Sequence, residues 1–195
     1  MHEDPIHARP QTAVAALAAL RSGHARFHAG EVHGERPPHA DSLREWVETQ
    51  RPWATIVACS DSRVAPEIVF DATMGELFVI RTAGQTLDGA ALGTIEYGVA
   101  HLGTPLVLVL GHTRCGAVMA ALGEGDHPAP LRSVVDPIRT SVPAGTDPVE
   151  AVRINARARA EDIRRSVPGV TASAGCHVAS AVFDLHDGSI DWLDG

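Results

Sequence analysis

The fold can be predicted from residues 105–122, which read PLVLVLGHTRCGAVMAAL. Residues 105–110 form an unbroken run of apolar side chains, which is typical of a strand that is buried on both faces. A short loop containing Gly111 follows, and residues 115–122 have the composition of a helix. A buried strand, a loop and a helix make up the repeating unit of a parallel sheet whose two faces are covered by helices.

Strand-like and helix-like segments alternate along most of the chain. Further strands are expected at 54–58 (ATIVA) and 77–80 (LFVI), and further helices at 64–70, 89–102 and 148–166. Residues 178–185 and 189–193 flank an Asp-Gly pair and predict a hairpin. The sequence therefore predicts an α/β fold with a mainly parallel central sheet, flanked by helices and extended by a C-terminal hairpin.

The first 48 residues differ from the rest. Residues 12–28 predict an amphipathic helix with Val14, Leu17 and Leu20 on its apolar face, and Ser42 is expected to cap a second, short helix. Six early histidines show no ligand spacing and are expected on the surface: His2, His7, His24, His28, His33 and His39. We expect residues 1–48 to form an N-terminal helical arm and loop, and residues 49–195 to form one α/β domain.

Composition narrows the class of protein. The formal net charge of −8 disfavours a nucleic-acid partner, because neutralising phosphates requires a basic surface. No apolar run reaches the roughly 20 residues that cross a bilayer, so no membrane partner is expected. The first residues lack the layout of a secretory signal, so a cytoplasmic location is expected. Three cysteines, an odd number in a chain without a recognisable export signal, indicate a metal site or a reactive thiol rather than disulfides.

Three potential metal ligands follow predicted strands. Cys59 comes directly after the strand at 54–58, and His112 and Cys115 follow the strand at 105–110. Ligands of open α/β sheets bind at the carboxyl ends of strands, so the three side chains converge if these strands are neighbours. Two thiolates and one imidazole are a zinc-binding set that leaves a fourth position for water. Each cysteine alone would more often be a small buried hydrophobe, and Cys176 is interpreted in that way.

Two motifs resemble the paired signature of the β-class carbonic anhydrases. They are Cys59-Ser60-Asp61-Ser62-Arg63 and the run GHTRCG at 111–116, and the resemblance also covers ELFVIRTAG (76–84) and LGTIEYGVAHLG (92–103). The resemblance implies a lyase that uses Zn²⁺ for the reversible hydration of carbon dioxide to bicarbonate and a proton, by a zinc-bound hydroxide. It also implies that Cys59, His112 and Cys115 hold the metal.

The loop after Cys59 carries the expected catalytic pair. Asp61 lies close enough in sequence to become a conditional fourth ligand, which would displace water from the metal. Arg63 can hold Asp61 in a bidentate ion pair and keep that position open. Asp61 would then accept a hydrogen bond from the zinc-bound hydroxide. An exposed Asp/Arg pair without such a role is the alternative.

The resemblance also implies substrate-binding residues and an assembly. Gln50 and Gly116 would bind the substrate, and Phe78 and Tyr97 would line its pocket across a dimer interface. Phe78 and Tyr97 could equally be a core residue and a helix-face residue. The family implies a homodimer or an assembly of dimers, with the N-terminal helix lying on the partner subunit. Three further residues are left open as interface or proton-transfer candidates: Arg81, Asp88 and His101.

Three other functions are compatible with parts of the pattern. A related zinc hydrolase acting on carbon disulfide or a similar small heterocumulene would have the same metal ligands. A non-catalytic zinc protein would close its site with Asp61 as a permanent fourth ligand. Thiol redox chemistry at Cys59 and Cys115 is disfavoured, because the chain has no C-x-x-C motif.

Overall fold

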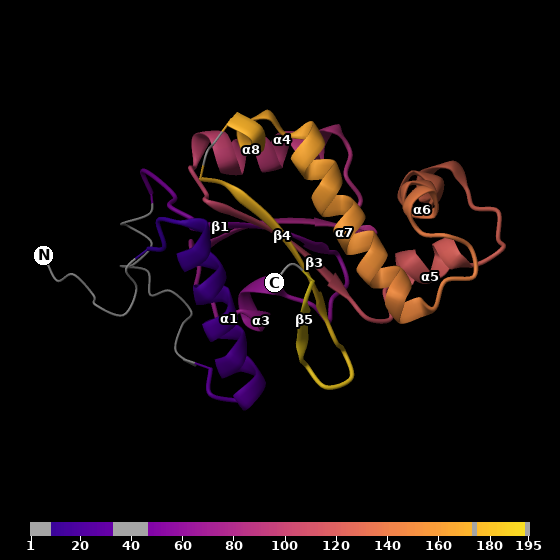
Figure 1. Cartoon of the computed structure of the whole chain (residues 1–195), viewed down its shortest axis with the longest axis horizontal. Helices are drawn as coiled ribbons and strands as arrows, with labels where there is room; N and C mark the ends of the chain where they lie inside the picture. The colour runs from indigo at the N-terminus through magenta and orange to yellow at the C-terminus, as the bar shows by residue number, and fades with distance from the viewer. Residues whose placement is uncertain (1–8, 33–46, 173–174, 194–195) are drawn as a thin grey trace, which may run out of the picture.

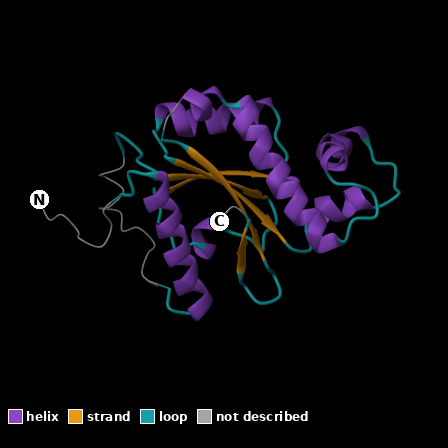
Figure 2. Ribbon diagram, viewed as in Figure 1, coloured by secondary structure: helices purple, strands orange, loops and turns teal. Residues whose placement is uncertain are grey.

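The computed structural model describes residues 9–32, 47–172 and 175–193. Within these ranges five strands form one sheet in the order β2-β1-β3-β4-β5. The strands are β1 (Ala54–Cys59), β2 (Leu77–Thr82), β3 (Leu106–His112), β4 (His177–Phe183) and β5 (Ile190–Trp192). The first four are parallel and β5 runs antiparallel to β4, so the predicted mainly parallel sheet and its C-terminal hairpin are confirmed (Figure 2).

Helices cover both faces of this sheet. They are α1 (Ala13–Ala29), α3 (Pro66–Val69), α4 (Gly89–Glu96), α5 (Gly116–Leu122), α6 (Ala129–Ser141), α7 (Pro148–Ser166) and α8 (Pro168–Ala172). Figure 1 shows α4, α7 and α8 on one face and α1 and α3 on the other. Each face has its own apolar core. Every residue of β1 and β3 is buried, because both strands lie in the interior of the sheet between these two layers.

The strand order places the expected ligands at one edge. β1 pairs with β2 on one side and with β3 on the other, so the direction of winding reverses between β1 and β3. This reversal is the position where open α/β sheets bind ligands, at the carboxyl ends of the strands. The neighbouring strands that the sequence analysis required are therefore present.

Two helical segments differ from the prediction. The helix predicted over 89–102 is α-helical only to Glu96, and a π-helical turn (Tyr97–His101) completes it. The helix α6 was not predicted: Pro130 and Pro137 lie within it, although Leu131, Val134, Val135 and Ile138 have helical spacing. Pro130 fits the first turn, where its missing N–H is not needed, and the helix buries Val135 and Ile138. The short helix predicted from Ser42 lies in 33–46, outside the described residues, except for its last residue, Val47.

The helix α1 buries part of the predicted apolar face, with Leu17 half-buried and Val14 the exception. Val14 is 80% exposed, whereas Ala16, Leu20 and Gly23 are buried against the same chain. A Cβ on Gly23 would lie 1.9 Å from the carbonyl oxygen of Phe70, so only glycine allows this close approach. Contact between the N-terminal arm and a partner subunit stays a prediction. No helix in the described ranges is long and apolar enough to span a bilayer.

His24 also lies on the buried face of α1, so the expectation that it is on the surface was wrong. Its ring lies 6.4 Å from that of Phe183, centroid to centroid, and its Nδ1 lies 3.3 Å from the carbonyl oxygen of Val69. A carbonyl oxygen only accepts, so Nδ1 donates this hydrogen bond. Burial lowers the pKa of His24 below its ordinary value, because the imidazolium loses its hydration.

We therefore expect His24 to make the protein less stable in mild acid. Its pKa is lower in the folded chain than in the unfolded chain, so the unfolded chain binds this proton first as the pH falls. Its stabilising contribution is present above about pH 6.5 and is lost as the pH falls towards the folded pKa. The urea-unfolding free energy should fall between about pH 7.5 and pH 5.5, and it should fall less in His24→Gln. His186→Gln, at an exposed histidine, is the control; equal pH dependence in wild type and His24→Gln would contradict the prediction.

Candidate metal centre

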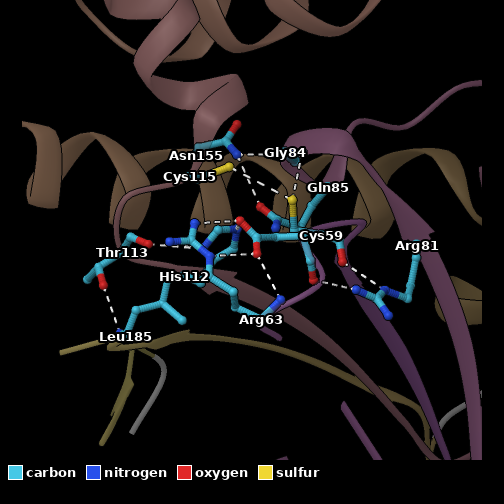
Figure 3. A network of polar contacts seen from close by, with 11 residues as sticks. Cys59, Arg63, Arg81, Gly84, Gln85, His112, Thr113, Cys115, Asn155 and Leu185 are labelled. Atoms are coloured by element: carbon cyan, nitrogen blue, oxygen red, sulfur yellow. Dashed lines mark hydrogen bonds and ion pairs between the residues drawn. The ribbon is translucent and has the colours of Figure 1, made fainter. Parts of the chain in front are cut away.

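Three side chains converge at the carboxyl ends of β1 and β3. Cys59 is the last residue of β1, His112 is the last residue of β3, and Cys115 lies directly before α5. All three are buried, and their ligand atoms lie within 4.8 Å of one another. The two sulfurs are 3.9 Å apart (Figure 3). Within the described ranges, no other group of three or more Cys, His, Asp or Glu side chains has this proximity.

The backbone between His112 and Cys115 brings both side chains to one point. Arg114 adopts a left-handed conformation with φ of 57°, which turns the chain sharply before α5. Thr113 anchors the turn: its N–H donates to the carbonyl oxygen of Phe183, and its hydroxyl lies 3.0 Å from the N–H of Leu185. The ligand loop is thus tied to the end of β4 and to the segment that follows it.

The orientation of the His112 ring suits metal binding. Nδ1 lies 2.9 Å from the carbonyl oxygen of Thr113, and it must donate this hydrogen bond because a carbonyl only accepts. In the neutral ring the other nitrogen, Nε2, then carries a lone pair. Nε2 is buried and has no hydrogen-bond partner among the described residues. A second-nitrogen hydrogen bond of this kind is usual for a metal-binding histidine.

The donor set and its spacing fit Zn²⁺. Thiolate and imidazole are the donors that zinc prefers. In a tetrahedral site with Zn–S distances of about 2.3 Å, two sulfurs lie roughly 3.8 Å apart. The observed separation of 3.9 Å between Cys59 and Cys115 agrees with this spacing. With the lone pair of His112 as the third donor, the residues present fit the ion.

The two thiols do not ionise equally on their own. The Cys115 thiol donates a hydrogen bond to the Cys59 sulfur and so lowers the pKa of Cys59. The backbone N–H groups of Gly84 and Asp61, which also point at this sulfur, lower that pKa further. The Cys59 thiolate in turn raises the pKa of Cys115, and burial adds to this effect. Two buried thiolates this close repel each other, so a bound cation is needed for both to be ionised.

Asp61 and Arg63 form the predicted ion pair beside this cluster. Arg63 Nε donates to Asp61 Oδ1 at 2.9 Å and Arg63 Nη2 donates to Oδ2 at 2.7 Å. The backbone N–H of Arg63 also donates to Oδ1. These hydrogen bonds hold the pKa of Asp61 far below its usual range. Oδ2 of Asp61 lies 3.8 Å from Nε2 of His112, so the carboxylate borders the same point as the three ligand atoms.

Arg81 has a role that the sequence did not reveal. It lies on β2 opposite Ala58, and its guanidinium donates to the carbonyl oxygens of Cys59 and Asp61 at 2.9 and 2.6 Å. It therefore clamps the loop that carries Asp61 and Arg63. Asp88 caps α4 by accepting from the N–H of Ala91, which is a structural role. The ring of His101 stacks on that of Tyr97.

The remaining predicted site residues are placed as follows. Gly116 is the first residue of α5, directly after Cys115. Gln50 is exposed at the surface of the chain. The rings of Phe78 and Tyr97 pack against each other with centroids 6.1 Å apart, and Tyr97 is 46% exposed. The substrate-binding roles of these residues stay predictions.

Comparisons with known proteins identify relatives of this chain. A family model described as carbonic anhydrase matches residues 54–190. The carbonic anhydrase of Mycolicibacterium smegmatis is 38% identical over 191 residues, which cover 91% of this chain and 92% of that protein. Carbonic anhydrase 2 of Mycobacterium tuberculosis is 46% identical over 140 residues, which cover 68% of this chain and 65% of that protein.

The fold also matches solved structures. A tetrameric β-carbonic anhydrase of the ascomycete Sordaria macrospora superposes with a TM-score of 0.68 at 22% sequence identity, covering 92% of this chain and 98% of that one. At this identity the likeness concerns the fold. The parallel sheet and the position of the ligand cluster at its carboxyl edge are features of this chain itself.

Proposed function

This chain belongs to the β-class carbonic anhydrase family, a family of lyases, and we propose that it catalyses the reversible hydration of carbon dioxide to bicarbonate and a proton. We propose Cys59, His112 and Cys115 as the ligands of one Zn²⁺. The observation that carries the proposal is the buried, unpartnered Nε2 of His112 facing two sulfurs at tetrahedral spacing.

The proposed chemistry divides between the metal and the protein. Zn²⁺ held by three protein ligands would supply an acidified water, with a pKa near about 7, in its fourth position. Asp61 is ionised throughout the neutral range, because Arg63 holds its pKa far below the usual range. An ionised carboxylate only accepts hydrogen bonds, so Asp61 can orient a donor beside His112. Arg63 occupies both carboxylate oxygens and restrains Asp61 from turning onto the metal.

The protein also has groups suited to hold the substrate. The backbone N–H of Gly116 is a free donor of the first turn of α5, directly beside a proposed ligand. We propose that Gln50 supplies an amide and that Phe78 and Tyr97 supply apolar surface, in a homodimer or an assembly of dimers. The exposure of Gln50 and Tyr97 in a single chain supports their use at an interface. The β-carbonic anhydrase of Sordaria macrospora is described as tetrameric. We propose a cytoplasmic location.

Metal analysis and a stopped-flow assay test the function directly. Purified protein is expected to carry about one Zn²⁺ per chain and to hydrate carbon dioxide. Removing zinc with a chelator should abolish hydration, and adding Zn²⁺ back should restore it. The same preparation is then assayed for hydrolysis of carbon disulfide.

The outcomes of this assay separate the candidate functions. Zinc-dependent hydration of carbon dioxide without hydrolysis of carbon disulfide supports the proposal. Activity on carbon disulfide alone would indicate the related hydrolase. Full zinc occupancy with neither activity would indicate a non-catalytic zinc protein. The ion pair between Asp61 and Arg63 counts against that last alternative, because it holds Asp61 away from the role of a fourth ligand.

A further inference from the structure

A short turn after β2 contacts the sulfur of Cys59. The turn is the 3₁₀ segment Ala83–Gln85, and the N–H of Gly84 donates to Cys59 Sγ at 3.4 Å (Figure 3). Gly84 has φ of 63° and Gln85 has φ of 55°, so two consecutive residues are left-handed. A Cβ on Gly84 would lie 2.7 Å from Ile138 Cδ1 and 2.9 Å from Ala117 Cβ. The turn therefore requires glycine at 84, in both conformation and space.

The turn is held in place by Asn155 of α7. The amide Nδ2 of Asn155 donates to the carbonyl oxygen of Gly84 at 2.9 Å and to Oε1 of Gln85 at 3.4 Å. Figure 3 shows Asn155 above the turn, with the sulfurs of Cys59 and Cys115 beneath it. The contacts form a chain from α7 through the Gly84 backbone to Cys59, and they join residues that are 71 positions apart in sequence.

Packing alone does not account for this asparagine. It is fully buried, and among the buried residues of α7 only Asn155 and Arg159 are polar, whereas the others are small or apolar: Ala151, Val152, Ala156, Ala160 and Ile163. Burying an amide is costly unless its groups are hydrogen-bonded. Asn155 Oδ1 and Gln85 Nε2 have no partner among the described residues, so part of this cost is not recovered. An apolar side chain would avoid it, but it would leave the Gly84 carbonyl without its donor.

We propose that Asn155 is a positioning residue for the metal centre. It holds the Gly84 carbonyl and thereby keeps the Gly84 N–H directed at the Cys59 sulfur. A hydrogen bond to a thiolate draws electron density from the sulfur, so Cys59 donates less charge to a bound metal. In a centre with two thiolate ligands, this preserves the positive charge that acidifies water. The proposal rests on metal binding by the proposed ligands, but not on the reaction that the centre catalyses.

The test compares Asn155→Ala with Val152→Ala, a matched truncation one helical turn away on the same buried face. Both full-length variants are loaded with Co²⁺, and the sulfur-to-cobalt charge-transfer band is recorded. Loss of the hydrogen bond makes the thiolate easier to oxidise, so the band of Asn155→Ala should shift to longer wavelength. The band of Val152→Ala should coincide with that of the wild type. The zinc-loaded Asn155→Ala variant should also lose roughly 10- to 100-fold in kcat.

Asn155→Ser repeats the test with a smaller change, in case the alanine variant does not fold. Its hydroxyl is too short to reach the Gly84 carbonyl without rearrangement, so the same shift is expected. A band that coincides with the wild type in a folded Asn155 variant would overturn the proposal, and so would an equal shift in Val152→Ala. The spectra do not depend on turnover. A wild type that fails to hydrate carbon dioxide would therefore count against the proposed function and leave this test intact.

Discussion

Replacing Cys59 with serine is expected to remove most of the zinc and to lower the hydration rate by more than about 100-fold. The serine hydroxyl stays protonated at neutral pH and is a poor ligand, whereas the thiolate is a soft donor suited to Zn²⁺. The cluster is buried, and Cys59 is the only one of its ligands on β1. Cys115→Ser should behave in the same way. Zinc per chain is measured by elemental analysis after gel filtration, together with the stopped-flow rate.

Cys176 provides the matched control for these variants. Burial raises the pKa of its thiol to about 11, and it lies directly before β4, apart from the ligand cluster. Cys176→Ser should therefore keep its zinc and its rate. If Cys59→Ser and Cys115→Ser both retained a full complement of zinc, the ligand assignment would be wrong.

The sheet and the ligand cluster were predictable because both depend on patterns within short segments. The continuous apolar runs of β1 and β3 require burial on both faces, and this placed them in the interior of the sheet. Once the two strands are neighbours, residues at their carboxyl ends must meet. Cys59 and His112 are such residues, and Cys115 follows His112 by three residues. The chemistry of the donors then selects the metal.

The errors arose where the type of a single residue was given more weight than the helical spacing around it. The helix α6 contains two prolines, which are typical of loops and obscure the helical spacing of its apolar residues. His24 lies four residues after Leu20 and so shares its buried face of α1, which the close approach of Gly23 to Phe70 holds against the chain. No periodicity of apolar residues reports such a contact.

The groups that surround the ligands were also beyond the sequence. The Gly84 N–H and the carbonyl clamped by Arg81 are backbone groups, which every residue possesses. Only their direction in space makes them part of the centre. Asn155 and Gly84 are 71 positions apart in the sequence, so no local pattern links them. The helix α7 contains many polar residues, and nothing in the sequence distinguishes Asn155 from the others as a partner of the turn. A buried asparagine on the apolar face of a predicted helix was the one available signal.

Arg63→Ala is expected to retain most of its zinc while losing roughly 10- to 100-fold in kcat/KM. In the wild type both carboxylate oxygens of Asp61 accept hydrogen bonds from Arg63. Without the guanidinium, the pKa of Asp61 rises towards its usual range, but the carboxylate stays ionised at neutral pH. It already lies 3.8 Å from Nε2 of His112, the atom proposed to bind the metal. The freed carboxylate can therefore turn and take the fourth position, where it would exclude water.

Two comparisons separate this explanation from a general loss of charge. Arg63→Lys keeps the positive charge but lacks the planar fork that holds both oxygens, so its rate should fall between those of the wild type and Arg63→Ala. The cobalt-loaded Arg63→Ala variant should show altered d–d bands, because a carboxylate replaces a solvent ligand, whereas its sulfur-to-cobalt band remains. Neither variant changes a proposed metal ligand. A difference in rate between them therefore reports how firmly Asp61 is held. A near-normal rate in Arg63→Ala, with Asp61 away from the metal in a crystal structure of that variant, would show that the carboxylate needs no restraint from Arg63.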